Sequence, residues 1–127
     1  MPVWLWVALG GALGSLARFG VGQLMVHFFG ERLTWGTLAV NLLGSFLAGL
    51  IWAWSIRGGQ VDTALHAPAY AFGLIGFCGG FTTFSAFTRE LFVLLQMGQF
   101  NQALLYIFMS IGLGIVGLWL GYRVLQL

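Results

Sequence analysis

Residues 76–90 read GFCGGFTTFSAFTRE, so glycines, hydroxyl side chains and phenylalanines crowd into the middle of a long apolar stretch. This composition predicts a membrane-spanning helix that is broken here. A break frees backbone carbonyls, and because lipid cannot satisfy them, it is stable only where it is buried in protein or lines a cavity. Freed carbonyls can bind a hard cation, as in the interrupted helices of transporters. Phe84 and Phe87 are three residues apart and share a face, although plain packing also explains such a pair.

The composition outside this stretch is that of a membrane protein. Of the 127 residues, 60% are hydrophobic and 6% charged, with no lysine, whereas soluble domains carry about 25% charged residues. A soluble monomer is therefore excluded. A disulfide scaffold is excluded because Cys78 is the single cysteine. The arginines are scattered singly rather than gathered in a basic stripe, which argues against nucleic-acid binding.

Four stretches are long enough to cross the hydrocarbon core, which takes about 20 apolar residues. They cover about residues 3–27, 35–56, 68–96 and 102–125. The segments between them are too short to fold alone, so we predict an all-α membrane protein with one four-span domain over residues 1–127. The first span has no basic residue before it, and we interpret it as a retained span rather than a signal peptide.

Orientation and assembly stay open at this level. With four spans, Arg57 and Arg123 lie on the side of both termini and Arg32 on the other, which is a weak bias under the positive-inside rule. The chain inserts either in one orientation or in both, and the second case gives an antiparallel dimer. Glycines four residues apart let helices approach closely in lipid, and we take their number as favouring an oligomer. These pairs are Gly10 and Gly14, Gly76 and Gly80, and Gly117 and Gly121.

Polar residues inside spans are costly and mark candidate sites. Arg18 lies about two-thirds along the first span, where it either extends to the interface or faces a wet vestibule that attracts anions. Asn41 shares a face with Thr37 and Ser45. It serves either as a hydrogen-bonding link between helices or as a functional group.

Three motifs closely resemble the Fluc family of fluoride channels, also called CrcB. They are GGFTTFSAF at 79–87, GTLAVNL at 36–42 and GSLARF at 14–19, and the resemblance extends over the whole chain. It implies an antiparallel, dual-topology homodimer with two pores and a third helix broken at mid-membrane. The implied function is passive export of fluoride across the inner (plasma) membrane, which prevents fluoride toxicity.

The resemblance also implies a structural Na⁺ at the dimer centre, held by the backbone carbonyls of Gly79 and Thr82. Phe84 and Phe87 are expected as the paired pore aromatics, because ring edges are positive and can contact a small anion without holding it too tightly to leave. The other residues of the expected anion pathway are Asn41 facing the anion, Arg18 near a vestibule, and the hydroxyl donors Thr37, Thr88, Tyr106 and Ser110.

Three features depart from the family pattern or lack a role. Phe81 adds a third phenylalanine beside the expected pore pair, and Gly114 stands where some relatives have a serine. Arg89 precedes Glu90 directly, and a mutual ion pair is the simplest interpretation of these charges.

Other function classes fit less well. A proton-coupled multidrug exporter needs a carboxylate in its first span, where this chain has Arg18. A non-transporting assembly factor has little need for a helix break and aligned polar residues. We expect no enzyme, since His27 and His66 lie at span ends and Cys78 has no second thiol beside it.

Overall fold

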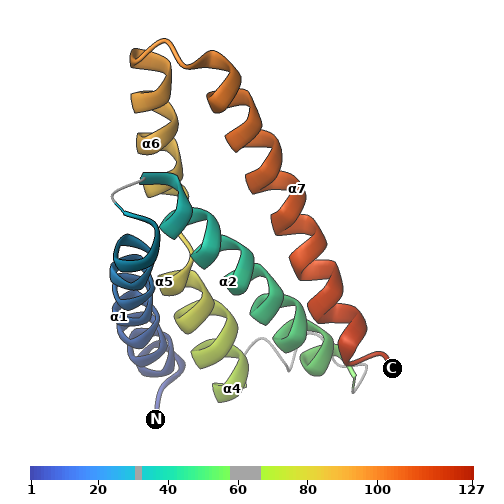
Figure 1. Ribbon diagram of the computed structural model, residues 1–127. Helices are drawn as coiled ribbons and strands as arrows, with labels where there is room; N and C mark the ends of the chain where they lie inside the picture. Colours follow the sequence, from blue (N-terminus) through green and yellow to red (C-terminus); the bar gives the residue numbers. More distant parts are fainter. Residues whose placement is uncertain (31–32, 58–66) are drawn as a thin grey trace.

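The computed structural model describes residues 1–30, 33–57 and 67–127, and these residues form helices without any strand (Figure 1). The expected all-helical class is confirmed. Four helical segments of 23 to 29 residues are long and apolar enough to cross a membrane. They consist of α1 (Val3–Phe29), α2 (Leu33–Ile56), a composite third span, and α7 (Phe100–Val124).

The third span is built from four consecutive pieces. A short α4 (Pro68–Tyr70) leads into a π-helix, η1 (Ala71–Cys78), and then into α5 (Gly79–Phe81) and α6 (Phe84–Gln96). Pro68 starts the first piece at a position where a helix tolerates proline. The interruption between α5 and α6 falls within the predicted stretch.

Glycines bring helix backbones into direct contact in two places. The α1 helix packs on η1 and α5, and a Cβ added at Gly14 would lie 2.2 Å from the carbonyl oxygen of Phe77. The α2 helix packs on α7, and a Cβ at Gly121 would lie 2.0 Å from the carbonyl oxygen of Phe46. All six paired glycines make such contacts within the chain. Packing within the chain accounts for these glycine pairs, so they give no separate support for an oligomer, which stays a prediction.

The hairpin of α6 and α7 extends past the ends of α1 and α2 (Figure 1). Gly98 makes its tight turn possible with a φ of +73°, a conformation that favours glycine. The N–H groups of Gly98 and Gln99 donate to the carbonyls of Leu95 and Leu94, so the turn satisfies the end of α6.

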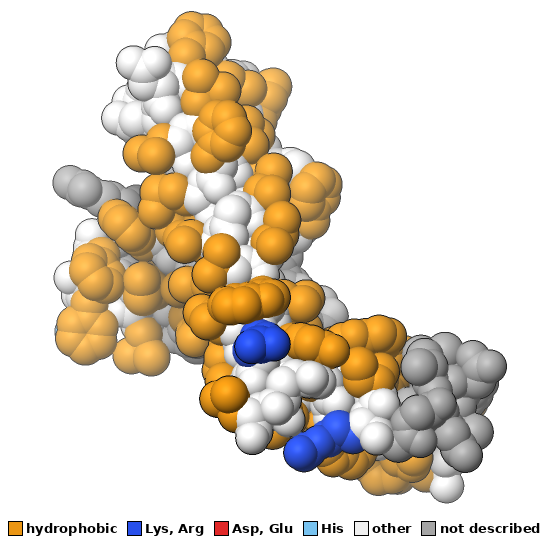
Figure 2. Space-filling view, turned by 90° about the vertical axis from the view of Figure 1, so that its right-hand side faces the viewer, with side chains coloured by type: hydrophobic (Ala, Val, Ile, Leu, Met, Phe, Trp, Pro, Cys, Tyr) orange, Lys and Arg blue, Asp and Glu red, His pale blue; other side chains and the backbone are white. Residues whose placement is uncertain are grey.

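Many large apolar side chains are exposed, and they occupy much of the face that Figure 2 shows. On α7, Phe108 is 71% exposed and Ile115 is 66% exposed. Contiguous apolar surface on this scale marks a region that contacts lipid or another protein.

Candidate functional site: the break in the third span

The helix break consists of two extended residues. Thr82 has φ −80° and ψ 158°, and Thr83 has φ −149° and ψ 118°. The Thr82 N–H and hydroxyl both donate to the carbonyl of Cys78, each at 2.9 Å. The Thr83 hydroxyl caps α6 by accepting the N–H of Ala86 at 3.1 Å. The threonine pair thus ends one helix and starts the next.

Asn41 on α2 forms hydrogen bonds with the backbone of the break at Thr83. Its side-chain Nδ2 donates to the Thr83 carbonyl at 3.1 Å, and its Oδ1 accepts the Thr83 N–H at 2.7 Å. Both backbone groups of Thr83 are therefore paired by one side chain from another helix. Asn41 is a link between helices, as one of our two interpretations held, and one N–H of its amide remains for a second acceptor.

The break leaves the four backbone carbonyls of residues 79–82 without the donors that a continuous helix would give them, and those of Gly79 and Thr82 are two of the four. In an α-helix, the carbonyl of Gly79 pairs with the N–H of Thr83, and that of Thr82 with the N–H of Ala86. Here these N–H groups donate to the side chains of Asn41 and Thr83 instead. Among the described residues, neither carbonyl accepts another hydrogen bond. These are the two carbonyls expected to bind a cation.

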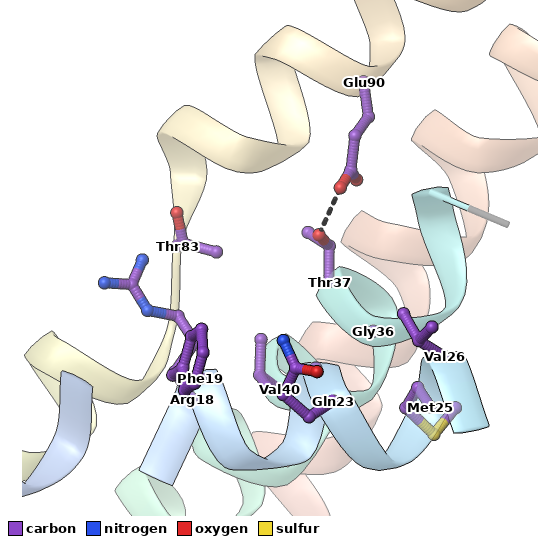
Figure 3. Close-up of a pocket in the computed structure, with 11 residues that line it drawn as sticks. Arg18, Phe19, Gln23, Met25, Val26, Gly36, Thr37, Val40, Thr83 and Glu90 are labelled. Atoms are coloured by element: carbon purple, nitrogen blue, oxygen red, sulfur yellow. Dashed lines mark hydrogen bonds between the residues drawn. The ribbon is translucent and has the colours of Figure 1, made fainter. Parts of the chain in front are cut away.

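Glu90 is buried, with 4% of its surface exposed, and both of its carboxylate oxygens accept short hydrogen bonds. The Thr37 hydroxyl donates to Oε1 at 2.7 Å (Figure 3), and the Tyr106 hydroxyl donates to Oε2 at 2.6 Å. The carboxylate joins α2, α6 and α7. The two hydroxyl groups thus occupy an acceptor position on each oxygen of the carboxylate.

Our interpretation of Arg89 and Glu90 as an ion pair is wrong. The two residues are consecutive on α6, so they point in directions about 100° apart. Arg89 is exposed while Glu90 faces inward, and no ion pair joins them. The sequence indicates the inward position of Glu90 only through spacing. Glu90 lies seven residues after Thr83 and three after Phe87, so it shares their face of α6.

The expected aromatic pair is present, and it continues into α7. The rings of Phe84 and Phe87 are 5.8 Å apart, and those of Phe87 and Tyr106 are 5.0 Å apart. Phe84 is 76% exposed, so one end of this row is open. Phe81 lies elsewhere, since it is buried and stacks on Phe77 at 5.7 Å.

The remaining candidate residues lie in different surroundings. Thr88 is exposed and donates to the Ser85 carbonyl at 3.0 Å. The Ser110 hydroxyl is buried and has no hydrogen-bond partner among the described residues. Arg18 is half-buried and borders a cavity together with Thr83 (Figure 3). Gly79 is exposed, with no atom within 4 Å of an added Cβ.

Two cavities meet at Glu90. One, of about 570 Å³, lies between α1, α2 and the break and includes Arg18, Thr37 and Thr83 (Figure 3). The other, of about 620 Å³, lies between α2, α6 and α7 and includes Tyr106. Each is large enough to hold several waters. Of the polar residues predicted from the sequence, Arg18, Thr37 and Tyr106 line one of these cavities and the others line neither, whereas Glu90 lines both.

Comparison with known proteins assigns the chain to a family. The sequence model described as "CrcB-like protein, Camphor Resistance (CrcB)" matches residues 5–122. The chain belongs to the CrcB family. This confirms the family resemblance, and with four apolar helices it identifies a multi-pass membrane protein.

Curated CrcB relatives are similar over nearly their whole length. A protein of Thermus thermophilus named fluoride-specific ion channel FluC is 49% identical over 97% of this chain and 94% of its own length. Proteins with the same name from Acidobacterium capsulatum and Geobacter sulfurreducens are 44% and 43% identical over 93% and 95% of this chain, and 91% and 94% of their own lengths. These relatives are named as ion channels, which move ions across a membrane and catalyse no reaction. Membership of their family confirms our expectation that this chain is not an enzyme.

Proposed function

We propose that this chain is a passive fluoride channel of the inner (plasma) membrane that exports F⁻ and so prevents fluoride toxicity. The observation that carries the proposal is the break at Thr82–Thr83 beside the Phe84 and Phe87 rings, in a chain whose relatives are named fluoride-specific channels. In acid surroundings neutral HF crosses the membrane and ionises inside. The negative interior then drives F⁻ out through an open pathway without any coupled ion.

The hydrogen bonds of the site indicate which N–H and O–H groups are free to donate to a fluoride ion that has lost its water. Fluoride is small and strongly hydrated, so several donors must replace its water. The free N–H of Asn41 and the unpaired hydroxyl of Ser110 are available. The hydroxyls of Thr37 and Tyr106 already donate to Glu90, so they reach an anion only by leaving that carboxylate. Thr88 is on the exposed side of α6, and Arg18 borders the cavity through which an anion approaches.

An antiparallel homodimer with two pores accounts for the open side of the break. Phe84 is largely exposed in a single chain, and a pore aromatic needs an opposing wall. A second chain packed on this side would supply that wall, and two-fold symmetry would produce every pathway twice.

A structural Na⁺ at the centre of this dimer would be held by the carbonyls of Gly79 and Thr82. Their helical donors are diverted to Asn41 and Thr83, and hard cations prefer oxygen ligands of this kind. Two chains together offer four such carbonyls. When bound, the ion supplies positive charge that lowers the cost of burying anions nearby. The break then lies at mid-membrane, at the crossing of the two chains.

The proposal is tested by efflux from liposomes that contain purified variants. Phe84→Ile removes a ring edge from the pathway and is expected to abolish fluoride efflux, whereas Phe108→Ile, at a similarly exposed position on α7, is expected to leave it unchanged. Equal efflux from both variants would contradict the pathway. Fluoride movement that depends on a proton gradient would instead indicate a coupled exporter, with Glu90 as its carboxylate.

A further inference from the structure

A polar row runs along α7 from the start of the helix into the membrane span. It consists of Gln102, Tyr106 and Ser110, which are four residues apart. Each is therefore about 40° around the helix from the next and about 6 Å further along it. Gln102 is the third residue of α7 and is exposed, whereas Tyr106 is buried. The row thus leads from one end of the span into its interior.

Two members of this row line the cavity of about 620 Å³ between α2, α6 and α7. Gln102 and Tyr106 border it. Glu90 and Gln99, the residue that precedes α7, line it as well. The cavity therefore extends from a buried carboxyl group to amide side chains at the end of the span. None of its described lining residues is an arginine, whereas the other cavity includes Arg18.

The carboxyl group of Glu90 indicates that this cavity holds water rather than hydrocarbon. A carboxylate can accept about four hydrogen bonds, and within the described residues Glu90 accepts only those of Thr37 and Tyr106. Lipid chains would leave the other acceptor positions unsatisfied, which is costly. Water can occupy these positions, because the cavity has room for several molecules and offers further polar partners in Gln99 and Gln102.

We propose that this cavity is an uncharged entrance to the anion pathway and that Gln102 donates its amide N–H to fluoride there. This role rests on the proposed channel function and adds to it a residue outside the break. An anion that approaches Glu90 from this side meets no arginine on the described wall, so uncharged donors must replace its water. Much of the wall is apolar, with Leu94, Leu105 and Met109 among its residues, so such donors are few and the loss of one should reduce conduction.

Substitutions at residues 101 and 102 separate the cavity wall from the neighbouring surface. Gln102→Leu removes the donor at similar volume, and the loss of one hydrogen bond is expected to lower fluoride flux about twofold to tenfold. Gln102→Glu keeps the shape of the side chain but adds a negative charge. It is expected to lower flux further, and most strongly at low ionic strength, because salt screens the charge. Asn101→Leu is the matched control and is expected to conduct normally, since Asn101 is an exposed amide in the same turn that lines neither cavity.

Chemical modification tests the entrance in channels that are already folded. Gln102→Cys and Asn101→Cys channels in liposomes are treated with a bulky, membrane-impermeant thiosulfonate reagent. The wild-type protein controls for native Cys78, which is 4% exposed. Attachment at residue 102 is expected to block the entrance, whereas Asn101→Cys channels should conduct normally after they have reacted.

The side from which the reagent acts connects the entrance with the proposed dimer. In an antiparallel dimer, reagent outside the liposomes reaches residue 102 of one chain and so the entrance of one pore. We therefore expect outside treatment to reduce the initial rate of fluoride efflux by about half, and treatment on both sides to remove nearly all of it. Complete block from the outside alone would support the entrance and contradict the antiparallel arrangement.

Three results would overturn the role of Gln102. Normal flux through channels whose residue 102 has reacted would remove the cavity from the anion pathway. Failure of residue 102 to react in the folded protein would mean that the cavity is dry or covered. Equal losses from Gln102→Leu and Asn101→Leu would indicate a general effect on the start of α7. Fluoride flux through the untreated wild-type protein decides the proposed function separately, because its absence would refute the channel itself.

Discussion

Asn41 offers the sharpest test of how the break is held. Asn41→Leu keeps a similar volume but leaves the N–H and carbonyl of Thr83 without partners. Each unsatisfied buried group costs about 1–3 kcal/mol, so the variant is expected to lose about 2–6 kcal/mol of unfolding free energy. Asn41→Asp retains the acceptor for the N–H and loses the donor to the carbonyl, so its loss of hydrogen bonding is about half as large.

The assay is reversible unfolding of the purified protein in mixed micelles, together with amide hydrogen exchange of the fragment that contains Thr83. Ser55→Ala is the control, because Ser55 also lies on α2 but donates to the Trp52 carbonyl of its own helix. Hydrogen bonds in membrane proteins average only about 0.6 kcal/mol. A loss below about 1 kcal/mol for Asn41→Leu, with unchanged exchange of Thr83, would refute the reasoning.

Three further predictions concern packing, the buried carboxylate and the cation. Gly14→Ala forces α1 off the third span, because its Cβ would lie 2.2 Å from a backbone oxygen, and it should cost about 1–3 kcal/mol in the same unfolding assay. Gly20→Ala, with nothing within 4 Å, should be neutral or stabilising, and an equal loss from both would contradict this packing. Tyr106→Phe removes the hydroxyl that donates to one carboxylate oxygen of Glu90. It should lower the free energy of unfolding by at least about 1 kcal/mol and so lower the thermal midpoint. An unchanged midpoint would mean that the hydrogen bond is not formed. Replacing Na⁺ by a bulky organic cation should reduce the fraction of protein that cross-linking traps as a dimer, because a bound ion stabilises the state that binds it. An unchanged fraction of dimer would contradict a structural Na⁺ at the dimer centre.

The elements of the fold could be predicted because they depend on local sequence. Apolar length alone defined the third span as residues 68–96, which agrees with the segment Pro68–Gln96. The composition around Gly79 and Thr82 predicted the interruption. The π-helix Ala71–Cys78 could not be predicted, because nothing in its own sequence distinguishes it from an α-helix and its register depends on close contact with α1.

The contacts of the site required the structure because they join distant residues. Asn41 and Thr83 are 42 residues apart, and Thr37 and Glu90 are 53 apart. Sequence position identified Asn41 and Thr37 as polar residues on one face of a span, yet it offered no means of pairing them with their partners. The glycine pairs could not indicate an oligomer for a related reason, since close helix approach looks the same in sequence whether the second helix belongs to this chain or to another.

The most direct test of the channel is ion efflux from liposomes loaded with fluoride or chloride, in which valinomycin carries K⁺ as the compensating ion and no proton gradient is present. We predict rapid fluoride efflux with little chloride efflux from the wild-type protein. Equal efflux of both anions, or no fluoride efflux from folded protein in the presence of Na⁺, would contradict the account.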